Sequence, residues 1–117
     1  MATDKKDLLT IQQIREMTGV TSRTLRYYEQ IGLIHPTARS ETGYRLYDRS
    51  VADTIGRIKK YKNLGYGLKE IRHILDDPDY DMVSSLDALI ETLQKRLELT
   101  EKQIAAAKEM KKDLPDH

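Results

Sequence analysis

The first pattern along the chain is a short amphipathic segment that ends at a glycine. Over residues 11–17 apolar side chains recur at every third position, which is the spacing of one face of a helix. Thr10 suits an N-cap, Gln13 can complete a capping box with it, and Gly19 can end the helix. We therefore expect a helix between Thr10 and Gly19.

A second amphipathic segment follows after a turn of a few residues. Thr21 or Ser22 can cap it, and Gly32 ends it. The apolar positions that should face the first helix are Leu25, Tyr28 and Ile31. The opposite face, at i, i+3, i+4, i+7 spacing, consists of Arg23, Arg26, Tyr27 and Gln30. Two short helices joined by a glycine-containing turn predict a helix-turn-helix.

The polar face of this second helix has the chemistry of a DNA recognition helix. Arginine, glutamine and tyrosine side chains hydrogen-bond phosphates, and arginine and glutamine also hydrogen-bond base edges. The alternative is an ordinary solvated helix face, on which the two arginines serve only solubility.

Residues 38–47 predict a β-hairpin. A turn-forming Thr-Gly pair lies between two short extended stretches, which together have the size of a wing. Arg39, Tyr44 and Arg45 lie at its tip and return strand, where they can run along a DNA backbone. The alternative is a plain surface hairpin whose Tyr44 and Tyr47 cover the core.

Residues 48–76 repeat the plan of two helices joined by a glycine-containing turn. Asp48 or Ser50 can cap the first of them, and the Gly-Tyr-Gly run at 65–67 separates it from the second. The expected inward positions are Val51, Ile55, Ile58, Tyr61 or Lys62 and, at its end, Leu64 in the first helix, and Leu68, Ile71, Ile74 and Leu75 in the second. The expected outward positions of the first helix are Arg57, Lys59, Lys60 and Lys62. Asp-Asp-Pro at 76–78 closes this domain.

From Val83 the pattern becomes that of one long helix with a heptad repeat. Its two seam positions are Val83, Ile90, Leu97 and Ile104, and Leu86, Leu93, Thr100 and Ala107. A helix of about 30 residues is about 45 Å long. Because that is far longer than is needed to pack against the residues before it, we expect the apolar stripe of this helix to pack against a second copy of the chain. In the alternative, the long helix folds back on the residues before it, but these could cover only the first two turns of the helix.

Charge divides the chain into a basic and an acidic part, although the net charge is only +1. Residues 1–75 carry 14 Lys and Arg against 8 Asp and Glu, whereas residues 76–117 carry 6 against 11. The front part therefore has a charge of +6 and the back part of −5, so only the front is suited to meet a polyanion.

Composition argues against several classes of protein. Without cysteine there are no disulfides, thiolate metal sites or cysteine nucleophiles, which fits a reducing cytoplasm. There is no Gly-rich phosphate loop, and His35, His73 and His117 lack the spacing of a metal site or a catalytic triad. No apolar run approaches the roughly 18 residues of a membrane span, and the start of the chain is too polar for a signal peptide. We expect a cytoplasmic protein with no enzymatic activity, cofactor, metal or membrane contact.

Four motifs together resemble the head of the MerR family of transcriptional regulators over residues 9–77. They are Leu-Thr-Ile-Gln-Gln-Ile with Thr-Gly-Val-Thr (9–21), Arg-Thr-Leu-Arg-Tyr-Tyr-Glu-Gln-Ile-Gly-Leu-Ile (23–34), Gly-Tyr-Arg-Leu-Tyr (43–47) and Leu-Gly-Tyr-Gly-Leu-Lys-Glu-Ile (64–71). The run Ile-Leu-Asp-Asp-Pro (74–78) before the leucine-rich helix looks like the TipA/Mta subgroup of multidrug- and antibiotic-responsive activators.

This resemblance implies a fold and a function. The fold is all-α with a small β-hairpin wing: a winged helix-turn-helix head and a long dimerisation helix that forms an antiparallel coiled coil. The homodimer would bind double-stranded promoter DNA at a palindrome and bend and untwist an overlong spacer, so that RNA polymerase engages through the promoter. The DNA-binding set is then Thr21, Ser22, Arg23, Arg26, Tyr27, Gln30, Arg39, Tyr44, Arg45, Lys59 and Lys62, with Lys59 or Lys62 clamping the backbone.

The expected organisation has five parts. They are an N-terminal tail (1–8), the winged helix-turn-helix domain (9–77), a linker (78–82), the coiled-coil helix (83–112) and a C-terminal tail (113–117). The dimerisation set is Val83, Leu86, Ile90, Leu93, Leu97 and Ile104.

The chain also departs from the family pattern. Metal- and redox-sensing members use cysteines, so metal or iron–sulfur sensing is not expected here. Drug-sensing members carry an effector domain after the coiled coil, and this chain stops soon after it. It therefore either lacks that domain or is a shortened form, and a small-molecule inducer is expected only if such a domain follows. The alternative functions are an excisionase-like repressor and a coiled-coil adaptor, although the basic face of residues 23–30 argues against the adaptor.

Overall fold

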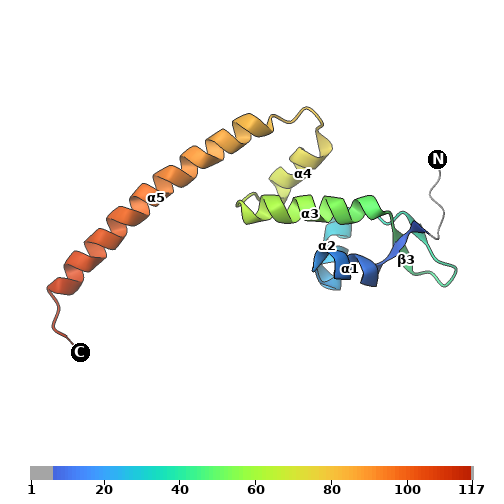
Figure 1. Cartoon of the computed structure of the whole chain (residues 1–117), viewed down its shortest axis with the longest axis horizontal. Helices are drawn as coiled ribbons and strands as arrows, with labels where there is room; N and C mark the ends of the chain where they lie inside the picture. Colours follow the sequence, from blue (N-terminus) through green and yellow to red (C-terminus); the bar gives the residue numbers. More distant parts are fainter. Residues whose placement is uncertain (1–6, 117) are drawn as a thin grey trace. The chain divides into compact units, whose positions relative to one another are not determined.

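Eight helices and strands follow one another in the part of the chain that the computed structural model describes, residues 7–116 (Figure 1). They are β1 (Leu9–Thr10), α1 (Ile11–Thr18), α2 (Ser22–Gln30), β2 (Ala38–Arg39), β3 (Arg45–Tyr47), α3 (Arg49–Asn63), α4 (Leu68–Asp76) and α5 (Met82–Lys112). They fall into two units, one that ends at Asp76 and one that begins at Asp77. We call the first unit the head.

The ends of α1 form as its sequence predicts. The Thr10 hydroxyl accepts a hydrogen bond from the Gln13 N–H at 3.2 Å, and the Gln13 side chain accepts one from the Thr10 N–H at 2.8 Å. This reciprocal pair satisfies two backbone groups that the first turn of a helix leaves open. Gly19 ends the helix with φ +74°, and its N–H donates to the Arg15 carbonyl. The predicted capping box is therefore confirmed.

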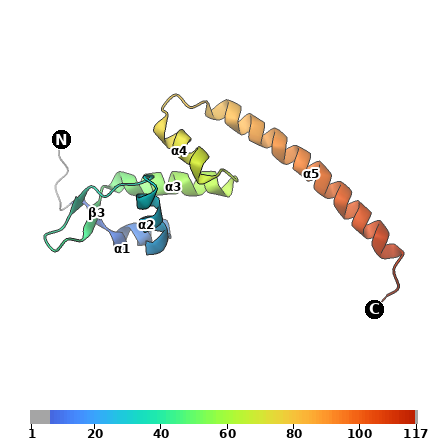
Figure 2. The same cartoon turned by 180° about the vertical axis from the view of Figure 1, so that it is seen from behind.

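The core of the head is centred on α3. Its Ile55 and Ile58 are fully buried, as are Ile14 of α1, Leu25 of α2 and Ile71 of α4. Figures 1 and 2 show α3 between α4 on one side and α1 and α2 on the other. The two predicted helix pairs therefore share one core.

The sheet has one strand more than the sequence predicted. Its order is β1-β3-β2, and β2 and β3 form the expected antiparallel hairpin. β1 was missed because two residues are too few to show an alternation of apolar and polar side chains. It pairs Leu9 with Tyr47 and Thr10 with Leu46.

The pairing of β1 also draws Leu8 into the core. The tail that we expected over residues 1–8 lies largely outside the described residues, but Leu8 itself is buried, with 7% of its surface exposed. Our boundary after residue 8 therefore placed in the tail a side chain that packs with the head.

The helix α5 is 31 residues long, and none of its residues is buried within the chain. Its first turn is capped by Asp81, which accepts hydrogen bonds from the Ser84 N–H and hydroxyl at 3.0 and 2.9 Å. These bonds hold the pKa of the Asp81 carboxyl below its usual value. Among the described residues, no helix is both long enough and apolar enough to cross a membrane.

We predict that Ile58→Ala lowers the free energy of unfolding of the head by about 2–5 kcal/mol, because it leaves a cavity among helices of both pairs. Urea denaturation followed by tyrosine fluorescence measures this, since six of the seven tyrosines precede Asp76. The control is Met17→Ala in α1, where the side chain is 50% exposed and the change should be small. Equal losses in the two variants would contradict a core centred on α3.

Candidate nucleic-acid interface

The outer face of α2 presents the four polar side chains that the helical spacing predicted. Arg23, Arg26, Tyr27 and Gln30 are all exposed, and with Ser22 they line a surface hollow of about 720 Å³. The opposite face is buried at Leu25 and Tyr28, as the spacing also predicted. The α2 face, as we call these four side chains, is therefore open to a ligand along its length.

The two arginines of the α2 face are not engaged elsewhere. Neither Arg23 nor Arg26 has a hydrogen-bond or ion-pair partner in the described part of the chain. Their guanidinium groups can therefore meet a phosphate or a base edge without first giving up a contact within the protein.

The sequence offered Thr21 and Ser22 as N-caps of α2, and in the structure Thr21 is the N-cap. Its hydroxyl oxygen accepts a hydrogen bond from the Thr24 N–H at 3.1 Å and lies 3.0 Å from the Thr24 hydroxyl. In this structure the Thr21 side chain therefore serves the helix start, while Ser22 faces the hollow.

The wing turns tightly around Gly43. The Gly43 N–H donates to the Ser40 carbonyl at 2.9 Å, and the residue has φ +87°, a conformation that favours glycine. Arg39 donates from Nη1 to the Gly43 carbonyl at 3.2 Å and so braces the turn. Tyr44 is 73% exposed, whereas Tyr47 is fully buried. The alternative in which both tyrosines cover the core is thus wrong for Tyr44.

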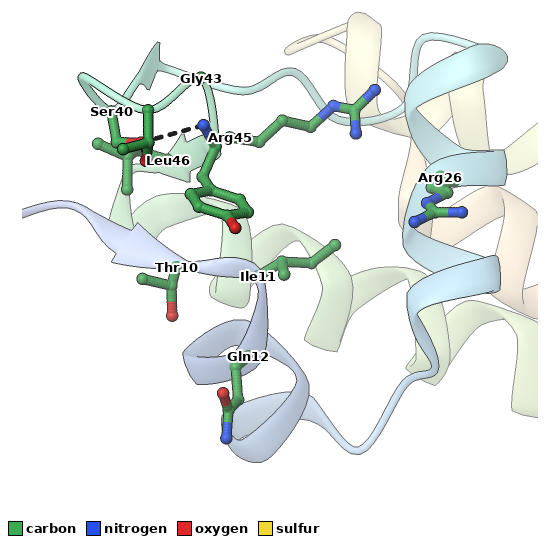
Figure 3. Close-up of a pocket in the computed structure, with 10 residues that line it drawn as sticks. Thr10, Ile11, Gln12, Arg26, Ser40, Gly43, Arg45 and Leu46 are labelled. Atoms are coloured by element: carbon green, nitrogen blue, oxygen red, sulfur yellow. Dashed lines mark hydrogen bonds between the residues drawn. The ribbon is translucent and has the colours of Figure 1, made fainter.

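A second hollow, of about 570 Å³, lies between the start of α1, α2 and the wing. Figure 3 shows Arg26 on its α2 side and Arg45 extending from the wing toward α2. Residues that sequence analysis assigned separately to the recognition helix and to the wing therefore line one continuous surface.

An ion pair joins the wing to α2. Arg45 Nε lies 3.3 Å from Glu29 Oε2, and the Glu29 side chain is only 12% exposed. The shielding of this carboxylate from water strengthens its attraction to the guanidinium. Arg45, assigned to DNA from the sequence, is thus engaged in holding the wing. The role of Glu29 could not be predicted from the sequence, because a single acidic residue near two arginines gives no sign of a partner in a distant strand.

Tyr47 lies under this ion pair. Its hydroxyl is buried and has no hydrogen-bond partner that meets ordinary geometry among the described residues. Burial, and next the negative charge of Glu29, disfavour the phenolate and raise the pKa of Tyr47 to about 12.

The two lysines assigned to the DNA backbone lie in different surroundings. Lys59 Nζ donates to the Thr18 carbonyl at 2.6 Å and so ties α3 to the last turn of α1. Lys62 is exposed and has no partner in the described part of the chain. Of the two alternatives, Lys62 is therefore the lysine available to a phosphate.

The described residues include no group of three or more His, Asp or Glu that could hold a metal ion. His35 and His73 are exposed, and His117 lies outside the described residues.

We predict that the free energy of unfolding depends on pH through the ionisation of Tyr47. Its pKa is about 12 in the folded chain, against 10.0 for an ordinary tyrosine, so its neutral form stabilises the fold fully below pH 10. That stability is lost as the pH rises from 10 through 12. Urea denaturation at pH 8 and pH 11 should show the wild type losing about 1 kcal/mol more than Tyr47→Phe. An identical pH dependence in the two proteins would contradict the raised pKa.

Comparison with known proteins agrees with this architecture. A family model described as MerR HTH family regulatory protein matches residues 9–77, and one described as MerR, DNA binding, matches residues 52–116. The HTH-type transcriptional activator mta of Bacillus subtilis is 36% identical over 86 residues, which are 74% of this chain and 34% of that protein. The HTH-type transcriptional activator TipA of Streptomyces coelicolor is 36% identical over 100 residues, 86% of this chain and 40% of that protein.

A solved structure shows the same fold. The crystal structure of MtaN, the N-terminus of the Bacillus subtilis multidrug transporter activator, matches with a TM-score of 0.80 at 31% identity, over 87% of this chain and 96% of that one. The chain itself spans about a third to a half of the length of the curated relatives it matches first. The predicted fold class is confirmed, and the chain belongs to the MerR family of helix-turn-helix regulatory proteins.

Proposed function

We propose that this chain binds double-stranded promoter DNA as a homodimer and regulates transcription, as an activator that distorts the spacer of a palindromic promoter. The observation that carries the proposal is the α2 face, where two arginines without partners, a tyrosine and a glutamine stand exposed beside the wing. Relatives named as transcriptional activators support the sign of regulation.

The α2 face would read the major groove. Arg23, Arg26 and Gln30 carry donors that match guanine and adenine edges, and Tyr27 adds a hydroxyl for a phosphate. The net charge of +6 over residues 1–75 provides the phosphate neutralisation on which affinity depends. Sequence would thus be read by α2, and most of the affinity would come from the basic surface around it.

The wing and α3 would fix the head on the DNA backbone. Tyr44 and Arg39 stand at the exposed end of the wing, and Lys62 on α3 is free to bind a phosphate. We now assign Arg45 and Lys59 a positioning role, because each already holds two elements of the head together. Arg45 keeps the wing next to α2, and Lys59 keeps α3 next to α1.

The helix α5 would join two heads. Its seam residues Val83, Ile90, Leu97 and Ile104 are 49–72% exposed within one chain. Burying such a stripe against a second copy stabilises both helices by roughly 25 cal/mol per Å² of apolar surface. Two joined heads could bind two half-sites at once, and the contacts of the second head would offset a DNA distortion that costs about 1–6 kcal/mol.

The partners and location follow from this role. RNA polymerase would be engaged through the distorted promoter, and a small-molecule inducer would act only through an effector domain after α5. A promoter-binding protein of this family works where the bacterial genome lies, so we place it in the cytoplasm.

We predict that Arg26→Ala and Lys62→Ala weaken DNA binding in different ways. Arg26→Ala should cost about 1–3 kcal/mol on a palindromic site selected from random duplexes and relax preference at one base pair of each half-site. Lys62→Ala should weaken specific and random DNA alike and make the salt dependence shallower. Gel shifts on the two kinds of DNA at several salt concentrations measure both effects. An equal loss of affinity for specific and random DNA in Arg26→Ala would mean that Arg26 contacts only a phosphate.

We also predict that Leu93→Lys with Leu97→Lys abolishes both dimerisation and site binding, because the charges enter the seam. The matched control is Leu99→Lys, since Leu99 is similarly exposed but lies outside the heptad stripe. Analytical ultracentrifugation and gel shifts give the two readouts. Full-strength site binding by a monomeric double variant would rule out the dimer as the binding species.

A further inference from the structure

The helix α2 ends in a turn that requires a residue in the left-handed conformation. The Gly32 N–H donates to the Glu29 carbonyl at 3.0 Å, and the Leu33 N–H donates to the Tyr28 carbonyl at 2.8 Å. These two bonds form a Schellman motif, in which the residue after the C-cap adopts a positive φ. Gly32 has φ +78°, a conformation that favours glycine. The end of α2 is therefore built around Gly32.

The space beside Gly32 is filled by a side chain from the other helix pair. A Cβ atom at Gly32 would collide with Nη2 of Arg72, which belongs to α4. The guanidinium of Arg72 thus lies against the backbone of Gly32, in the place that a side chain would take. Glycine is needed here for two reasons, its positive φ and the room that it leaves for Arg72.

The guanidinium of Arg72 lies at a helix end of opposite charge. The aligned peptide dipoles of a helix place about half a negative charge at its C-terminus, and a cation at that end stabilises the helix. The last turn of α2 contains no basic residue. The cation that α2 lacks in its own sequence is therefore supplied by α4.

Arg72 has no strong partner that would draw it away from α2. In the described part of the chain its only ion pair is with Asp76, one turn further along α4, at 3.9 Å. The two side chains are 50% and 72% exposed, so water screens their attraction and the pair contributes little. The contact with Asp76 therefore does not compete strongly with the position over Gly32.

A constraint at the end of α2 acts on the side chains that would read DNA. The nine residues of α2 span about 14 Å, and Tyr27 and Gln30 of the α2 face belong to its last turn. A hydrogen bond from Gln30 to a base edge needs a donor–acceptor distance of about 2.7–3.2 Å. A small tilt of this end of the helix would therefore break the contact of Gln30 before it affected the rest of the head.

We propose that Arg72 is a positioning residue for DNA recognition, which reaches from α4 to the C-terminus of α2 and fixes the direction of the α2 face. This inference rests on the proposed function and adds to it a residue that does not itself touch DNA. It also couples the second helix pair to the helix that reads the sequence.

Binding to selected and random duplexes tests this role. Arg72→Ala should weaken binding to the selected palindrome roughly three- to tenfold, because both heads of the dimer lose the contact, and should leave random DNA and the salt dependence unchanged. Preference should relax at the base pairs where Gln30→Ala relaxes it. Arg72→Lys keeps the positive charge and should recover most of the loss. An equal loss on both kinds of DNA with a shallower salt dependence would make Arg72 a phosphate contact and overturn the proposal.

A change at Gly32 tests the same contact from its other side. Gly32→Asn keeps the helix end, because asparagine also adopts the left-handed conformation, but its Cβ displaces the guanidinium of Arg72. This variant should reproduce the effect of Arg72→Ala, and the double variant should lose no more affinity than either single one. Additive losses would show that the two residues act separately and would overturn the proposal.

Amide hydrogen exchange tests the contact without DNA. The amides of Gly32 and Leu33 should exchange about two- to fivefold faster in Arg72→Ala, while the amides of α3 keep their rates. The control is Arg57→Ala, which removes the same charge from a side chain that contacts Tyr61 within α3 and should leave the end of α2 unchanged. Unchanged exchange at Gly32 and Leu33 in Arg72→Ala would overturn the proposal. Faster exchange there, in a protein whose wild type binds no duplex DNA, would overturn the proposed function and leave the contact between α4 and α2 standing.

Discussion

The packing of α1, α2 and α4 against the buried stripe of α3 is the interaction on which the rest of the head depends. Ile55 and Ile58 are fully buried there, and neither short helix of the first pair is long enough to be stable in water by itself. The direction of α2, and so the direction in which its arginines point, is a consequence of that packing. Lys59 adds a polar contact to it by holding the end of α1 on α3.

The basic side chains of the head divide into two kinds. Arg45 forms an ion pair with a carboxylate of the protein and so fixes the wing. Lys59 donates a hydrogen bond to a backbone carbonyl and so fixes α1. Arg23, Arg26 and Lys62 have no such partner in the described part of the chain. This division matters for affinity, because a surface whose geometry is already set loses less conformational entropy when it binds. It also explains why Glu29, an acidic residue on a helix meant for a polyanion, is compatible with that role.

Most of the fold could be predicted from the sequence because its signals are local. The capping box at Thr10, the alternation of buried and exposed faces on α2 and the break before Leu68 each involve residues within one or two helical turns. What could not be predicted depends on residues distant in the chain. The pairing of Leu9 with Tyr47, the bond from Lys59 to Thr18 and the ion pair of Arg45 with Glu29 follow from the tertiary fold, which no periodicity reveals. The sequence therefore predicted which surface forms the site. It did not predict which of the basic side chains on that surface already have partners within the protein.

The absence of any buried residue on α5 has a consequence for how the protein would respond to its own abundance. A helix with no buried residue gains little from folding alone, so if two chains pair through α5 as proposed, ordering of the helix and association of the chains would be one step that is second order in protein. The population competent to grip two half-sites would then rise with roughly the square of expression while monomers dominate. A modest change in synthesis would then produce a steep change in promoter occupancy, because none of the residues of α5 is buried within a single chain.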